Sequence, residues 1–178
     1  MRFLTDFGDA MVVLPIAAAT LAWLVRVAGP RTAGLWCLAL LACGAPEPAL
    51  ESPSGHTSMS TLVYGSLALI IGAEAAPWQR FAAAALGAAA IIGIALSRVT
   101  LGAHSVAEVA IGLAIGAGVL ALFARRYLEA PPAARNLAPL AVSVVLLMLM
   151  LHGRSAHLEA VWHGIAAELH DTAGLCRG

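Results

Sequence analysis

Two short polar clusters carry the residues of this chain that could do chemistry. The first is Pro53-Ser54-Gly55-His56, and the second begins with Ser97-Arg98 and continues, after five further residues, to His104 and then Glu108. The guanidinium of Arg98 is planar and permanently charged, and its geometry matches the oxygens of a phosphate group. Histidine is a nucleophile or a proton carrier near neutral pH. The two clusters therefore predict a site for chemistry on a phosphate group.

The first cluster precedes an apolar run, at a place where a helix is expected to begin. The backbone amides of residues 54–56 would then converge on an anion, and the helix dipole would favour its binding. The Ser54 hydroxyl, the Arg98 fork and these amides would take up the charge that develops on the phosphate oxygens. Each well-placed donor of this kind is worth roughly 3–4 kcal/mol in the transition state.

The second cluster brings an imidazole and a carboxylate together. His104 and Glu108 are four residues apart at the start of a predicted helix, so they lie on one face of it. The carboxylate can hold one imidazole nitrogen and leave the other to attack phosphorus. His56 can hold a proton and give it to the departing oxygen. Two histidines with opposite protonation requirements predict a bell-shaped pH profile.

These residues resemble the second and third signature motifs of the type 2 phosphatidic acid phosphatase (PAP2) superfamily. Its membrane members are metal-independent lipid phosphatases, and its soluble relatives include vanadium haloperoxidases. No metal and no cofactor are expected here. The resemblance implies a role for each matching residue: His104 as nucleophile through a phosphohistidine, His56 as general acid, Glu108 as orienter of His104, and Arg98, Ser54 and Gly55 as phosphate binders. We count Ser97, which precedes Arg98, among the phosphate-binding candidates.

The chain departs from the family pattern in two respects. The third motif usually ends in Asp, whereas Glu108 is one methylene longer. The first motif, a Lys followed by Arg-Pro, has no match, because the chain contains no Lys and its upstream Pro30-Arg31 is reversed and on the wrong side. A phosphate site that is short of cations should borrow them. We expect Arg154 or Arg2 to supply the missing charge.

Simpler interpretations of the same residues stay open at this point. Ser105-x-x-Glu108 is also a capping box for the helix that begins there, and both roles are compatible. His104 alone would suit an interfacial histidine, and Ser97 could merely end a helix. Two histidines and a carboxylate could also hold a transition metal, but the nearby Arg98 would repel the cation.

The elements that position these clusters are expected to be membrane-spanning helices. Of the 178 residues, 61% are hydrophobic and 11% are charged, which is typical of an integral membrane protein. We predict an all-α fold, a bundle of six membrane-spanning helices with a PAP2-like core, forming one domain over residues 1–152. The predicted spans are residues 10–27, 32–44, 59–73, 81–96, 106–124 and 137–151. Gly112-x-x-x-Gly116, with Gly87 and Gly93, suits close packing of helices.

Residues 153–178 have a different pattern. Apolar residues recur at helical spacing from Leu158 to Leu169, while histidines and acids occupy the other face. This segment is expected to form an amphipathic helix on the membrane surface. The histidines of the segment match no tight metal-binding spacing. Cys37, Cys43 and Cys176 are too few for a disulfide framework and are interpreted as packing residues.

The distribution of arginine predicts the orientation. With six spans, both polar clusters and both termini share one side, which carries four Arg and eight acids, whereas the other side carries six Arg and two acids. By the positive-inside rule the clusters face away from the cytoplasm. We expect a multi-pass protein of the bacterial inner membrane, with its site on the periplasmic side.

The predicted partner is a phosphorylated lipid whose tail stays in the bilayer. An isoprenyl diphosphate, phosphatidylglycerol phosphate and phosphatidic acid fit equally, and the formal net charge of zero gives no reason to expect a nucleic-acid partner. The predicted activity is hydrolysis of a phosphomonoester or diphosphate on the lipid headgroup. The alternative is a non-catalytic PAP2-like membrane protein that binds phosphorylated headgroups or keeps only the fold.

Overall fold

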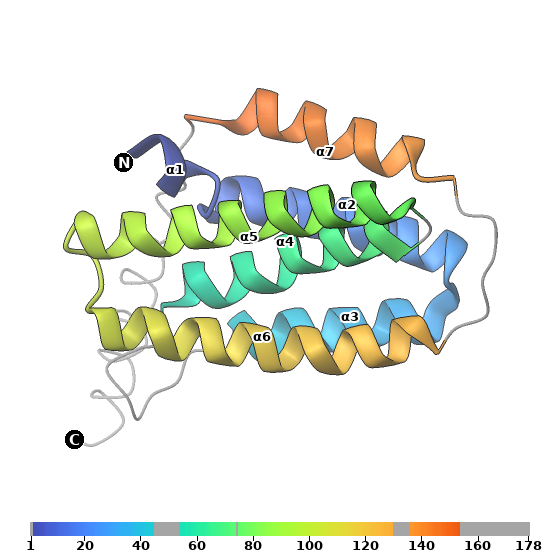
Figure 1. The fold of residues 1–178 in the computed structure, drawn as a ribbon, viewed down its shortest axis with the longest axis horizontal. Coiled ribbons are helices and arrows are strands. Elements are labelled where there is room, and N and C mark those ends of the chain that lie inside the picture. Colours follow the sequence, from blue (N-terminus) through green and yellow to red (C-terminus); the bar gives the residue numbers. More distant parts are fainter. Residues whose placement is uncertain (1, 45–53, 74, 130–135, 154–178) are drawn as a thin grey trace, which may run out of the picture.

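The protein is a bundle of helices, seen in a computed structural model that describes residues 2–44, 54–73, 75–129 and 136–153 (Figure 1). No strand occurs in these ranges, and the all-α prediction is confirmed. The helices are α1 (Arg2–Asp6), α2 (Ala10–Val27), α3 (Gly29–Gly44), α4 (Gly55–Ala73), α5 (Pro77–Thr100), α6 (Val106–Leu128) and α7 (Ala138–Leu151).

Each predicted span coincides with one of the six longer helices, but several ends differ. Helix α4 begins at Gly55, four residues before the predicted start, because the Ser54 carbonyl accepts the amides of Thr57 and Ser58. Helix α5 begins at Pro77, which favours the first turn, and the Gln79 side chain accepts the Ala76 amide there. The prediction placed these residues in a loop, so both helices are longer than expected.

Three helical segments are long and apolar enough to cross a membrane by themselves. They are Phe3–Val27, Pro77–Thr100 and Val106–Leu128, and α7 is a shorter apolar helix. Large apolar side chains such as Phe81, Leu86 and Leu122 lie exposed on their outer faces. The protein is therefore a membrane protein. Six crossings stay a prediction, and the expected amphipathic tail lies, from residue 154 on, outside the described residues.

Helix α4 lies inside the bundle and packs against α2, α3, α5 and α6 (Figure 1). More than half of its 19 residues are buried, and many of these are hydroxyl residues. Their polar atoms are mostly paired within the protein. The Thr61 hydroxyl donates to the Thr57 carbonyl at 2.7 Å, and the Ser66 hydroxyl accepts the Trp36 indole N–H at 3.0 Å. A polar helix is stable here because its neighbours shield it from lipid.

Two glycines let α6 approach the backbone of α4. A Cβ at Gly112 would lie 2.8 Å from the Ser54 carbonyl oxygen, and one at Gly116 would lie 2.7 Å from the Ser58 carbonyl oxygen. Both distances are too short for a methyl group, so only glycine fits. The prediction that Gly112-x-x-x-Gly116 packs helices closely is confirmed. Gly93 differs, since a Cβ there would be in ordinary contact with Leu4 at 3.5 Å.

The close contact between α4 and α6 predicts unequal effects of two alanine substitutions on α6. Gly116→Ala should lower the midpoint of thermal unfolding, because overpacking costs about 1–3 kcal/mol. Gly118→Ala is the matched control, since a Cβ there meets no atom of the described part of the chain within 4 Å, and it should leave the midpoint unchanged or raise it. Thermal unfolding of the detergent-purified variants measures both. Equal shifts would contradict the close contact.

Candidate functional site

The two polar clusters meet at one end of the bundle. The first residues of α4, the last turn of α5 and the first turn of α6 all lie at the end where α1 lies (Figure 1). Because α5 and α6 are joined by the short segment 101–105, the second cluster forms a compact corner. The hairpin expected from the sequence therefore brings the clusters to the same end.

Ser54 links the two clusters directly. It is fully buried, and its amide donates to the carbonyl of Glu108 at 3.3 Å. Its hydroxyl oxygen accepts a hydrogen bond of 2.9 Å from the Thr57 hydroxyl. The sequence predicted that the Ser54 amide would converge on an anion, whereas the structure uses this amide to join α4 to α6. Thr57 was not singled out, and only its place one turn along from Ser54 could have indicated it.

Gly55 and His56 are the first two residues of α4. Gly55 is exposed, and a Cβ at this position would meet no atom of the described residues within 4 Å. The His56 side chain is half-buried. Both residues belong to the first turn, where the dipole of the helix favours negative charge.

Arg98 lies in the last turn of α5 and is half-buried. Its Nε atom is buried, and it has no hydrogen-bond partner within the described ranges. A buried donor without a partner costs about 1–3 kcal/mol, and more when it is charged. An anion bound at the guanidinium would remove that cost, so this atom favours a site for an anionic group.

The turn after α5 fixes His104 beside Arg98 through the backbone. Gly102 has a φ of 67°, in the left-handed region that glycine adopts without strain. This reversal turns the chain back, and the amides of Ala103 and His104 both donate to the Arg98 carbonyl, at 3.0 Å and 3.3 Å. These main-chain contacts hold the backbone of His104 beside the last turn of α5, which carries Arg98.

Glu108 contacts both His104 and the helix cap. Its Oε2 lies 3.5 Å from Nδ1 of His104, which is an ion-pair distance but is longer than an ordinary hydrogen bond. The same oxygen accepts the Ser105 amide at 2.6 Å, and the Ser105 hydroxyl accepts the Glu108 amide at 3.3 Å. Both interpretations of Glu108 thus correspond to contacts in the structure. The Nε2 atom of His104 faces away from this carboxylate, since Nδ1 takes the near side.

Ser97 was predicted to bind phosphate, but in the structure its hydroxyl bonds to other parts of the protein. It is fully buried, it donates to the Ile94 carbonyl at 2.6 Å, and it accepts a hydrogen bond of 2.7 Å from the Thr5 hydroxyl. Its hydroxyl is therefore occupied by contacts that join α1 to α5. Thr5 had no motif around it, so this contact could not be predicted from the sequence.

Helix α1 is held against the site end of the bundle by further contacts. The Tyr64 hydroxyl donates to the Phe7 carbonyl at 2.6 Å, and the His152 ring stacks on Phe7 at 4.7 Å between centroids. Arg2 is the first residue of α1, whereas Arg154 lies outside the described residues. Where the structure describes the chain, no three His, Cys, Asp or Glu residues lie close enough to hold a metal ion.

Comparison with known proteins identifies the family. The family model described as PAP2 superfamily matches residues 7–131, which is more than half of the chain and includes both clusters. The chain belongs to the PAP2 superfamily, a family of phosphatase type. No curated protein and no solved structure matches the chain significantly. The coarse activity of the family is that of a phosphoric ester hydrolase.

Glu108 contacts both the cap of α6 and His104, so one substitution should affect the stability of the helix and another the orientation of His104. Glu108→Gln keeps a side chain that can complete the capping box, but it removes the negative charge beside His104. We expect unchanged thermal stability and a fall of about a hundredfold in phosphate release, at the low end of what acid–base groups contribute.

Ser105→Ala is the matched variant, because it removes the cap and keeps the carboxylate. It should lower stability by about 1 kcal/mol and leave most of the phosphate release. If Glu108→Gln destabilises the protein as much as Ser105→Ala and keeps full phosphate release, Glu108 is only a capping residue.

Proposed function

We propose that the protein is a membrane lipid phosphatase that hydrolyses a phosphomonoester or diphosphate on a lipid headgroup. The observation that carries the proposal is the buried Nε of Arg98, which has no hydrogen-bond partner among the described residues, in the helix turn that precedes the His104–Glu108 pair. A guanidinium with a free buried donor, on the same corner of the bundle as an imidazole that contacts a carboxylate, suits attack on a bound phosphate. Membership of the PAP2 superfamily supports the same chemistry at a coarse level.

The proposed reaction has two steps. The Nε2 atom of neutral His104 attacks phosphorus, the bond from phosphorus to the leaving oxygen breaks, and His56 gives that oxygen a proton. The phosphorylated imidazole then carries positive charge, which the Glu108 carboxylate near Nδ1 stabilises. In the second step water attacks phosphorus, the bond to Nε2 breaks, and its proton passes to His56. Arg98 and the first turn of α4 hold the phosphate oxygens throughout. The net reaction consumes water and requires no metal.

The position of the site at one end of a membrane bundle supports a lipid substrate. A lipid tail can stay in the bilayer while its phosphate enters the site from the membrane edge. An isoprenyl diphosphate, phosphatidylglycerol phosphate and phosphatidic acid all have this form. We place the protein in a bacterial inner membrane with the site on the periplasmic side, because arginine is concentrated at the opposite end.

The proposal predicts metal-free phosphate release that depends on His104. Detergent-purified protein is incubated with a panel of lipid mono- and diphosphates in the presence of a chelator, and inorganic phosphate is measured. The wild type should release phosphate from at least one lipid, and His104→Ala should reduce this at least about a thousandfold, since it removes the nucleophile.

Arg98→Lys and Arg80→Lys provide a matched pair in the same assay. Arg80 belongs to the first turn of α5, and α5 begins at the opposite end of the bundle (Figure 1), so only the substitution at Arg98 should impair phosphate release. A folded wild type that releases no phosphate from any lipid would overturn the proposal in favour of a non-catalytic PAP2-like protein. Release abolished by the chelator would overturn the metal-free reaction.

We further propose Arg2 as the cation that replaces the missing first motif. Arg2 belongs to α1, and the Thr5 hydroxyl of the same helix donates to Ser97, the neighbour of Arg98, so α1 lies beside the last turn of α5. Arg2→Ala should therefore raise the KM for the lipid phosphate about tenfold, which corresponds to one charge-assisted hydrogen bond. Arg26→Ala, at the other end, is the control. If Arg2→Ala and Arg154→Ala both leave phosphate release unchanged, neither residue supplies the charge.

A further inference from the structure

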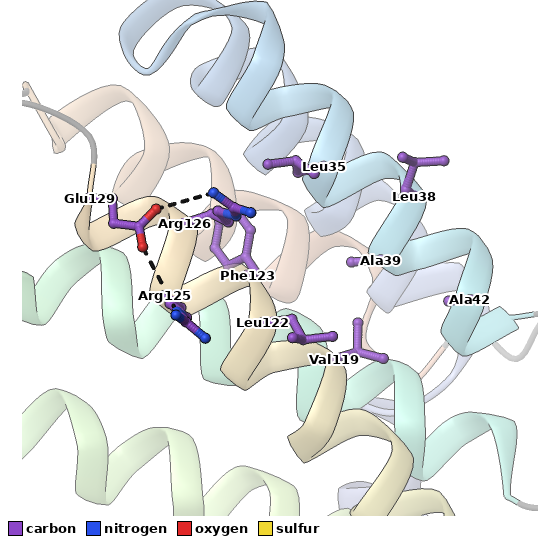
Figure 2. Close-up of a pocket in the computed structure, with 10 residues that line it drawn as sticks. All are labelled: Leu35, Leu38, Ala39, Ala42, Val119, Leu122, Phe123, Arg125, Arg126 and Glu129. Atoms are coloured by element: carbon purple, nitrogen blue, oxygen red, sulfur yellow. Dashed lines mark hydrogen bonds and ion pairs between the residues drawn. The ribbon is translucent and has the colours of Figure 1, made fainter.

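A groove between α3 and α6 lies at the end of the bundle opposite to the candidate site (Figure 2). Its cavity volume is about 440 Å³. One wall comes from the middle and second half of α3, and the other comes from the last three turns of α6. The lining residues are Leu35, Leu38, Ala39, Ala42, Val119, Leu122, Phe123, Arg125, Arg126 and Glu129.

Most of the groove is apolar and faces outward. Ala39 and Phe123 form a buried floor, whereas Leu38 and Leu122 are 63% and 68% exposed at the rims. No described residue covers these rims, which lie on the outer faces of α3 and α6. A groove with this lining suits a hydrocarbon chain.

The length of the groove matches one leaflet of a bilayer. Its lining on α6 extends from Val119 to Glu129, which at the rise of an α-helix is roughly 15 Å. The hydrocarbon core of a bilayer is about 30 Å thick, so half of it is about the same length. One acyl chain that enters from the membrane surface would therefore fill the groove from the headgroup level to the midplane.

Positive charge is concentrated where the groove reaches the membrane surface. Arg125 and Arg126 both contact Glu129, at 3.8 Å and 3.4 Å, as Figure 2 shows. The two guanidinium groups are 79% and 67% exposed, so their pairing with one carboxylate is weak and leaves an excess positive charge. Arg31 adds to it, since it is exposed and lies one turn before Leu35 on the same face of α3.

We propose that this groove binds an anionic phospholipid of the leaflet opposite to the candidate site. One acyl chain lies between Leu38 and Leu122, and the phosphate lies against Arg125 and Arg126. Basic pockets between membrane helices select anionic headgroups for the same electrostatic reason. The site is separate from the proposed catalytic site, because the lining residues lie at the other end of α6 from Glu108.

Retention of defined lipids by the purified full-length protein tests the site. Native mass spectrometry compares phosphatidylserine with phosphatidylcholine of the same acyl chains, two phosphodiesters that the proposed reaction neither makes nor consumes. The wild type should retain phosphatidylserine preferentially. Arg125→Gln with Arg126→Gln should reduce this preference about tenfold or more, because each arginine near the surface contributes to the attraction.

The matched control removes the same charge outside the groove. Arg26 and Arg80 lie at the same end of the bundle and do not line the groove, so replacing both with Gln should leave the preference intact. A second variant, Ala42→Leu, fills the exposed apolar part of the groove. It should reduce retention of both lipids without changing the charge.

Two results would overturn the proposal. The first is an equal loss of preference in the groove variant and in the control variant, which would mean attraction by the whole surface. The second is a change from dimer to monomer in Arg125→Gln with Arg126→Gln, with lipid retention unchanged, which would make the groove an interface between two copies of the chain.

Discussion

The backbone contact between α4 and α6 is the constraint on which the site depends. Gly112 and Gly116 present no side chain to Ser54 and Ser58, so the two helices approach until the carbonyl oxygens of α4 lie against α6. At this separation the Ser54 amide reaches the Glu108 carbonyl. One hydrogen bond thus joins residues from the two motifs, which are more than fifty positions apart in the sequence. Any residue larger than glycine at these positions would move the start of α6, and with it His104, away from the start of α4.

The polar character of α4 follows from its central place. Its serines and threonines would be costly in contact with lipid, but α3, α5 and α6 shield them, and partners such as the Cys43 carbonyl accept their hydrogen bonds. The outer helices α5 and α6 carry the exposed apolar side chains instead. Buried hydroxyl side chains therefore lie inside the bundle beside its apolar core. The helix that carries most of those described begins at the candidate phosphate-binding cluster.

Most of the fold could be predicted because local patterns decide it. Apolar runs separated by prolines gave six helices at the right places, and Gly112-x-x-x-Gly116 and the Ser105–Glu108 box predicted a helix contact and a helix cap that the structure contains. The sequence could not predict contacts between residues far apart that have no motif around them. The Thr5–Ser97 hydrogen bond and the hydrogen bond from the Ser54 amide to the Glu108 carbonyl are of this kind, because both depend on how closely the helices pack. The missing first motif was visible in the sequence, whereas a cation that could replace it cannot be read from any local pattern.

We propose that His104 carries the phosphoryl group, and trapping the phosphorylated protein tests this. The protein is mixed with a radiolabelled lipid phosphate, quenched in alkali within milliseconds, and digested so that the labelled residue can be located by mass spectrometry. A phosphohistidine is stable to alkali and labile to acid. We predict such a label on His104 in the wild type and none in His104→Ala. Steady phosphate release by the wild type with no label on His104 at any time would contradict the claim.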